Sequence, residues 1–146
     1  MTFNLLSSKD AKNFRRSVEN QWGIVISREY SFVKSSSGKI FVLSKGVGFV
    51  DSSKLRISSI GLYVADETYG LRLSLDGAIL WGDGASKNVI YLLDDQKKLW
   101  LSGSNISGIV GDGWVIVKCG DDILGCGLIK NSILKNYVPK SRRIPE

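Results

Sequence analysis

The spacing of hydrophobic positions divides the chain into a helical start and a mostly β remainder. Between residues 11 and 22, apolar side chains recur every three or four positions, which predicts a helix with one buried stripe of Ala11, Phe14, Val18 and Trp22. Ser7 and Asp10 have the spacing of a helix-capping box at its start. From about residue 30 the period approaches two, and segments 31–34 and 39–44 predict a hairpin that turns around Gly38.

A second hairpin is predicted from segments 60–67 and 71–75, joined through Thr68-Tyr69-Gly70. The following segment, 75–81, is expected to form a short helix that stops at Gly82-Asp83-Gly84. We take this glycine cluster as the boundary between two domains, 1–84 and 85–146.

The second domain is predicted to be all β. Four short apolar segments are expected as strands, at 88–93, 99–102, 113–119 and 123–129. The pairs Asp94-Asp95 and Asp121-Asp122 are expected in the turns between them, because aspartate hydrogen-bonds the local backbone there. The predicted fold class is therefore α+β, an N-terminal α/β domain followed by a small β-pseudobarrel.

Composition indicates a globular protein. The 146 residues are 43% hydrophobic and 23% charged, which is enough for a sizeable core. No apolar run approaches the roughly 18 residues of a membrane-spanning helix. The first residues lack a basic stretch followed by an apolar one, so we expect no signal peptide, no membrane and a cytoplasmic location.

The residue types available argue against catalysis. The chain has no histidine, which removes the Ser/His/Asp and Cys/His triads and the usual general base. Cys119 and Cys126 cannot supply the four ligands of a zinc site, and a hairpin between them would not place them opposite each other, so two buried thiols are favoured. Gly46-Val47-Gly48 and Gly125-Cys126-Gly127 do not complete a dinucleotide fingerprint. We therefore expect no catalytic residue, no metal, no cofactor and no small-molecule substrate.

The positive charge is concentrated at the end of the chain. Overall, 20 Lys and Arg face 14 Asp and Glu, a net charge of +6, and residues 128–146 hold five cations against Glu146. Such a basic end is typical of a phosphate-binding surface, although a solvated terminus has the same composition. Tyr137 lies among these cations, either to stack on a base or to pack on the barrel. The remaining aromatic side chains of interest, Trp81, Trp100 and Trp114, are expected in the core.

Several of these residues resemble a known family. Segment 113–144 is similar to the last strands of a PUA domain, a small RNA-binding pseudobarrel whose hallmark is a strand, a turn and Leu-Gly-aromatic-Gly before a basic end. Leu124-Gly125-Cys126-Gly127 matches that hallmark, with Cys126 in place of the aromatic residue. The tail is similar to the ending of archaeal PUA proteins at Lys135-Asn136, Pro139-Lys140 and Arg143, but departs from it at Ser141 and Arg142.

The resemblance extends upstream over segments 39–45 and 53–80, which are similar to the pre-PUA domain of the Nip family of large-ribosomal-subunit biogenesis factors. A close competitor is the PUA-like C-terminal region of Sun-family RNA cytosine-5 methyltransferases. The chain lacks a methyltransferase domain and a Pro-Cys nucleophile motif, so this resemblance would make it a stand-alone relative.

Either resemblance implies a protein that binds RNA, and the residue types described above lead us to expect that it catalyses nothing. The first implies pre-ribosomal RNA, in single-stranded segments, and possible pre-ribosomal protein partners in ribosome biogenesis and rRNA processing. The residues expected to contact RNA are Lys130, Lys135, Asn136, Tyr137, Lys140, Arg142 and Arg143. Two other hypotheses are a protein-docking module and an accessory RNA-binding subunit of an RNA-modifying enzyme.

Overall fold

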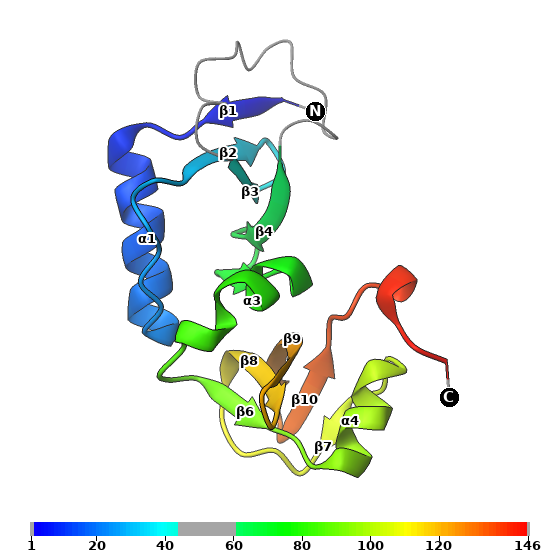
Figure 1. Ribbon diagram of the computed structural model, residues 1–146. Coiled ribbons are helices and arrows are strands. Elements are labelled where there is room, and N and C mark those ends of the chain that lie inside the picture. Colours follow the sequence, from blue (N-terminus) through cyan, green and yellow to red (C-terminus); the bar gives the residue numbers. More distant parts are fainter. Residues whose placement is uncertain (1, 44–60, 146) are drawn as a thin grey trace.

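Two five-stranded sheets, one on each side of Gly82–Gly84, dominate the computed structural model, which describes residues 2–43 and 61–145 (Figure 1). Helices α1 and α3 cover the first sheet, and α3 lies between that sheet and the second one. The predicted mixture of helices and sheets is therefore confirmed.

The first sheet is wholly antiparallel, with the strand order β1-β2-β3-β4-β5. Both predicted hairpins are present in it, β2 with β3 around Gly38 and β4 with β5 through residues 68–70. The predicted short helix also forms, and it is α3. The elements of this half are β1 (Phe3–Leu5), α1 (Ser8–Trp22), β2 (Ser31–Ser35), β3 (Lys39–Leu43), β4 (Leu62–Asp66), β5 (Arg72–Leu73) and α3 (Leu75–Trp81).

Helix α1 has the predicted cap and buried stripe. The Ser7 side chain accepts a hydrogen bond from the Asp10 backbone N–H at 3.1 Å, which satisfies one free donor of the first turn. The helix ends at Gly23, whose φ of 76° is easily reached only without a side chain. The chain then runs back along the helix to β2 (Figure 1). The stripe of Ala11, Phe14, Val18 and Trp22 faces the core.

The second sheet has the order β6-β8-β9-β10-β7, with β6 parallel to β8 and the other pairs antiparallel. Helix α4 packs against one face of it through Trp100, which is fully buried. The elements of this half are η3 (Gly82–Gly84), β6 (Val89–Tyr91), α4 (Asp94–Leu101), β7 (Ile106–Ser107), β8 (Gly113–Cys119), β9 (Asp122–Lys130), β10 (Ile133–Asn136) and η4 (Lys140–Arg142).

The prediction of a strand at 99–102 is wrong, because these residues belong to α4 and its C-cap. Asp94 and Asp95 lie in the first turn of this helix rather than in a hairpin turn, where their charge favours the helix N-terminus. The Gln96 side chain accepts a 2.8 Å hydrogen bond from the Leu93 backbone N–H and fixes the start of the helix. A short apolar run such as Leu99-Trp100-Leu101 fits a strand and a helix equally well.

The glycines of the Leu-Gly-Cys-Gly segment allow close packing on one face of β9. A Cβ on Gly127 would lie 2.8 Å from the ring of Trp100, so only glycine leaves room for that indole. Cys126, which replaces the expected aromatic residue, points to the opposite face of β9. It is buried there in the cluster that contains the α1 stripe. Cys119 pairs with Asp122 across the hairpin and Cys126 with Ile116, so both thiols are free as predicted. Cys119 is only half-buried, however, so the prediction that both thiols are buried is wrong for this residue.

One hydrophobic core joins the two halves. The stripe of α1 and the inner face of the first sheet pack in the same cluster as Ile116 of β8 and Cys126 of β9. A second cluster lies between the opposite face of the second sheet and α4. The predicted boundary at Gly82-Asp83-Gly84 thus separates the two sheets but not their cores.

Two features of the sequence lie outside the described residues. They are Gly46-Val47-Gly48 and segment 53–60, which contributes to the resemblance upstream.

Candidate nucleic-acid interface

The structure separates the five cations of residues 128–146 into two groups. Lys130 ends β9, Lys135 lies on β10 and Lys140 begins η4, and within residues 2–43 and 61–145 none of the three forms an ion pair. Arg142 and Arg143 instead bond to the protein itself. Three of the five predicted phosphate ligands are therefore without an ion-pair partner among the described residues.

Arg142 and Arg143 fasten the tail to the rest of the fold. The guanidinium of Arg142 donates to both carboxylate oxygens of Asp76 on α3, at 3.1 and 3.3 Å. Arg143 Nε donates to the Val138 carbonyl at 3.1 Å, and its side chain lies against Gly103. Each arginine therefore ties the tail to another part of the fold.

Asn136 is also engaged by the fold. Its side-chain amide donates to the carbonyls of Trp100 and Ser104, at 2.7 and 3.0 Å, and its Oδ1 accepts from the Val138 N–H at 2.8 Å. Both amide hydrogens are thus used inside the barrel, which leaves only acceptor capacity for a base or sugar.

Tyr137 packs on the barrel and also keeps part of its ring exposed to solvent. Its ring packs edge-on against Trp114, with centroids 4.8 Å apart, yet 43% of the residue stays exposed. Trp114 is half-buried and packs against the core, so the prediction that it is a core residue is confirmed only in part. The Arg72 guanidinium lies 5.6 Å from the Trp114 centroid and 5.5 Å from that of Tyr137, a cation–π arrangement.

These three side chains form one wall of a groove between the two halves of the molecule, with a volume of about 660 Å³. We call it the inter-sheet groove. The first half contributes the β2–β3 and β4–β5 hairpins, and the second half contributes the residues around Tyr137. Tyr69, at the tip of the β4–β5 turn, is 89% exposed. The groove is lined by Ser37, Lys39, Asp66, Thr68, Tyr69, Gly70, Arg72, Trp114, Leu128 and Tyr137.

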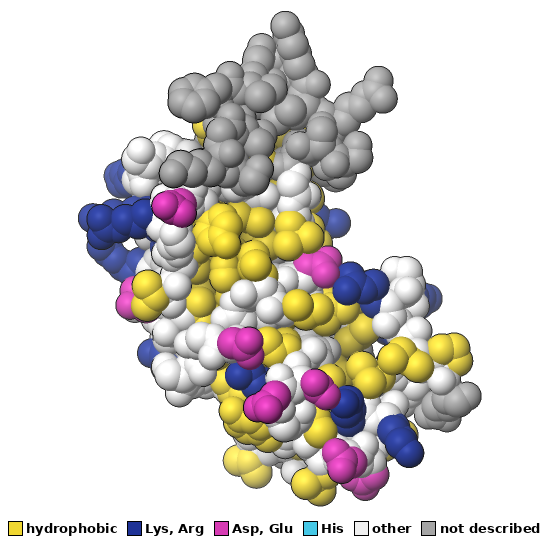
Figure 2. Space-filling model, viewed as in Figure 1, with side chains coloured by type: hydrophobic (Ala, Val, Ile, Leu, Met, Phe, Trp, Pro, Cys, Tyr) yellow, Lys and Arg dark blue, Asp and Glu magenta, His cyan; other side chains and the backbone are white. Residues whose placement is uncertain are grey.

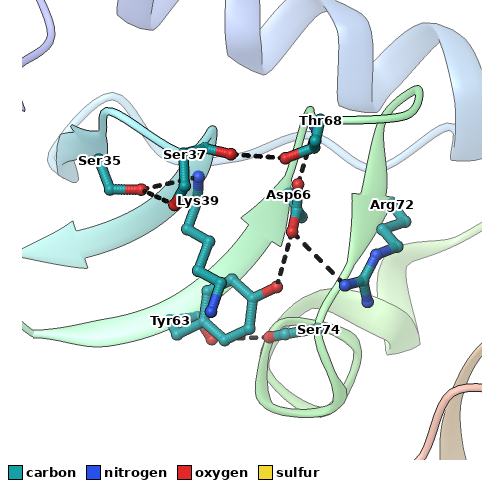
Figure 3. A network of polar contacts seen from close by, with 8 residues as sticks. All are labelled: Ser35, Ser37, Lys39, Tyr63, Asp66, Thr68, Arg72 and Ser74. Atoms are coloured by element: carbon teal, nitrogen blue, oxygen red, sulfur yellow. Dashed lines mark hydrogen bonds and ion pairs between the residues drawn. The ribbon is translucent and has the colours of Figure 1, made fainter. Parts of the chain in front are cut away.

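Asp66 is the centre of the polar network that holds the groove wall (Figure 3). Its carboxylate accepts from the Thr68 N–H at 2.8 Å, from the Tyr63 hydroxyl at 3.4 Å and from Arg72 at 3.5 Å. Burial acts to raise the pKa of Asp66, but the hydrogen bonds from Thr68 and the charge of Arg72 outweigh it, and the pKa lies below its usual value. The anionic Asp66 therefore fixes Arg72 beside the aromatic rings.

Strand register places two of the free lysines next to this groove. Leu128 of β9, which lines the groove, pairs with Trp114 of β8 on one side and with Lys135 of β10 on the other. Directly paired residues project from the same face of a sheet, as do residues two apart on a strand. Lys135 and Lys130 therefore lie on the face of the second sheet that carries the groove.

Sequence reasoning missed the contribution of the first half to this site. Lys39, Tyr69 and Arg72 were placed correctly in hairpins, but nothing local indicates that they face Tyr137, 65 or more positions away. The available signals were a cation within the apolar Leu71-Arg72-Leu73 strand and an aromatic residue in the Thr68-Tyr69-Gly70 turn.

No group of three or more metal-ligating side chains gathers within the part of the chain that the structure describes. Among the same residues, no helix has the length and apolar character needed to cross a bilayer. The chemistry that the groove offers is aromatic stacking, fixed positive charge and hydrogen bonding.

Comparison with protein families agrees with this architecture. Residues 87–144 match the family model described as the methyltransferase RsmF PUA domain. The second half of the chain is therefore similar to a PUA domain, the class of pseudobarrel expected from the Leu-Gly-Cys-Gly segment and the basic tail. The match is to the Sun-type methyltransferase domain that was the competing resemblance, and not to the Nip family that we expected first.

Two curated relatives extend the similarity over nearly all of the chain. The ribosomal RNA small subunit methyltransferase F of Aeromonas hydrophila is 29% identical over 145 residues, which cover 92% of this chain and 28% of the relative. The protein of the same name from Aeromonas salmonicida is 28% identical over 142 residues, covering 94% and 29%. The chain thus spans less than a third of the length of these relatives.

Proposed function

We propose that this chain binds single-stranded ribosomal RNA in the inter-sheet groove and performs no catalysis itself. The observation that carries the proposal is the cluster of Tyr137, Trp114 and Arg72, in which an exposed ring stands beside a fixed cation. Proteins that bind single strands combine stacking platforms with a positive track for phosphates. Lys130 and Lys135 supply that track on the same face of the second sheet.

The names of the relatives support ribosomal RNA as the target, because both are ribosomal RNA small subunit methyltransferases. We therefore favour the hypothesis of an accessory RNA-binding part in an RNA-modifying system, acting in the cytoplasm. In this role the groove holds an RNA segment while a separate catalytic centre performs the chemistry.

The test is a titration of the full chain with a labelled 20-nucleotide single strand of RNA and with duplex DNA, at 50, 100 and 200 mM salt. We expect preference for the RNA and a salt dependence that reflects phosphate contacts. Since each contact to a single strand adds about −0.7 to the log–log slope, Lys130→Gln/Lys135→Gln should flatten it by about 1.4.

The matched control is Lys87→Gln/Lys98→Gln, which removes the same charge from exposed lysines outside the groove. This control should leave the slope nearly unchanged. Equal affinity for RNA and DNA, or equal effects of the two double variants, would identify a generic polycation and would refute a defined RNA site.

A further inference from the structure

A second basic groove lies along α1 in the first half of the molecule, away from the tail. Lys and Arg side chains gather over α1 at one edge of the molecule (Figure 2). The groove runs between α1 and the returning segment 24–28, with a volume of about 480 Å³. Its charged lining consists of Lys12, Arg15, Arg16, Glu19 and Arg28. We call it the α1 groove.

Helical geometry brings the cations of α1 to one face. Lys12, Arg15 and Arg16 are spaced by three and four positions, and residues at such intervals are neighbours on a helix surface. Their face is distinct from the buried stripe that packs on the sheet. The turn at Gly23 then sends the chain back along this face, so that Arg28 forms the other wall over a floor of buried Ile26.

The positive charge of this cluster is only partly offset within the described structure. Four cations share the α1 groove with one carboxylate, Glu19, and none of the five forms an ion pair within the described residues. Lys12 and Arg16 are like charges at i and i+4, an arrangement that destabilises an isolated helix. By contrast, Arg142 and Arg143 of the tail are bonded to the fold. The α1 groove therefore retains uncompensated positive charge suited to an anionic ligand.

We propose that the α1 groove binds the phosphodiester backbone of RNA, as a second contact beyond the inter-sheet groove. The inference rests on the proposed function, because the anionic ligand of the α1 groove is taken to be the RNA strand that the inter-sheet groove binds. None of the described residues that line the α1 groove is aromatic, so this lining offers charge without a stacking platform. Such a surface positions a strand through its phosphates and carries no sequence preference of its own.

The experiment compares three double variants of the full chain, each of which removes two positive charges. Arg16→Gln/Arg28→Gln alters both walls of the α1 groove, Lys130→Gln/Lys135→Gln alters the inter-sheet groove, and Lys87→Gln/Lys98→Gln is the control. Each protein is titrated with a labelled 40-nucleotide single-stranded RNA at several salt concentrations. Photocrosslinking with 4-thiouridine RNA then maps the contacted peptides.

We expect the α1-groove variant to bind about 10-fold more weakly at 0.15 M salt, with a slope flatter by about 1.4, from the loss of two phosphate contacts. Crosslinks should appear in residues 8–28 of the unaltered protein. Binding equal to that of the control variant, while the inter-sheet variant is weakened, would overturn this inference and leave the proposed function intact. Weakening of the α1-groove variant alone would support the inference and refute the inter-sheet site. Absence of RNA binding by the unaltered protein would refute both.

Discussion

At the scale of single residues, Tyr137 is the side chain on which RNA binding should depend most. Its exposed ring is supported by Trp114 and Arg72, so it is preorganised for a base to stack on it. Stacking of one base on an aromatic side chain contributes about 1–3 kcal/mol. Tyr137→Ala should therefore weaken binding of single-stranded RNA by roughly 5- to 150-fold in a fluorescence titration.

Two variants keep this test specific. Tyr137→Phe retains the ring and should bind nearly as well as the unaltered protein. Tyr91→Ala removes an exposed ring from β6, outside the inter-sheet groove, and should have little effect. If the Tyr137→Ala variant binds RNA as tightly as the Tyr91→Ala variant, the Tyr137 ring packs on the barrel and does not stack on a base.

A second prediction at this scale concerns the reactivity of Cys126. Burial raises the pKa of its thiol to about 12, against the opposing effects of a hydrogen bond from the Leu73 backbone and the charge of Arg72. Because the thiolate is the reactive form, iodoacetamide at pH 8 should modify Cys126 about 1,000-fold more slowly in the folded protein than in urea. The modification is measured by mass spectrometry in the Cys119→Ser variant, where Cys126 is the remaining cysteine.

The same shift has a defined sign for stability. The folded pKa lies above the unfolded value, so retention of the proton stabilises the fold fully below about pH 9, the ordinary value of the thiol. This contribution is lost as the pH rises from about 9 to about 12.

In the modification experiment, rapid reaction of Cys126 with iodoacetamide in the native protein at pH 8 would contradict its place in the shared core.

At the scale of elements, the close approach of β9 to α4 explains the second glycine of Leu-Gly-Cys-Gly. A methyl group on Gly127 would collide with Trp100 and Leu134, each 2.8 Å from the added carbon. We expect Gly127→Ala to lower the free energy of unfolding by about 1–3 kcal/mol, measured by urea denaturation. Gly84→Ala, where no atom lies within 4 Å, is the control and should change stability little. Equal stability of the two variants would show that α4 can move away.

The sequence predicted elements wherever a local signal was strong. The stripe of α1, its Ser7 cap and the turns at Gly38 and residues 68–70 were all identified, because period and turn chemistry are local properties. Helix α4 was missed, since its single deeply buried side chain, Trp100, gives no period. Its helical state is decided by packing on β9, where the indole donates to the Leu124 carbonyl at 3.0 Å.

At the scale of the whole molecule, the candidate site depends on contacts that no short segment encodes. Tyr137 was predicted to contact RNA because cations flank it in the sequence. Lys130 and Lys135 were predicted to do so because they belong to the basic end of the chain. Arg72 faces Tyr137 only because β5 packs near β9 in the folded chain. The sequence showed that Asn136 is polar and Arg142 is basic. It did not show that Asn136 is hydrogen-bonded to a backbone carbonyl and Arg142 to a carboxylate within the fold.

The shared core predicts that both halves unfold together, although each has its own sheet. Ile116 of β8 is fully buried in the cluster that contains the α1 stripe, so either half alone would expose part of that cluster to water. The urea transitions followed by tryptophan fluorescence and by far-ultraviolet circular dichroism should therefore coincide.

Ile116→Val makes this prediction sharper, because it removes one methylene from the shared cluster without preventing folding. We expect it to lower the free energy of unfolding by about 0.5–1.5 kcal/mol and to reduce amide-exchange protection in α1 as well as in β8. Val33→Ala, in the small cluster on the outer face of the first sheet, is a comparison that does not touch the shared core. Two separate transitions, or loss of protection in β8 alone, would mean that the halves fold independently. Coupled unfolding would instead mean that the inter-sheet groove, whose walls come from both halves, exists only when the entire core is formed.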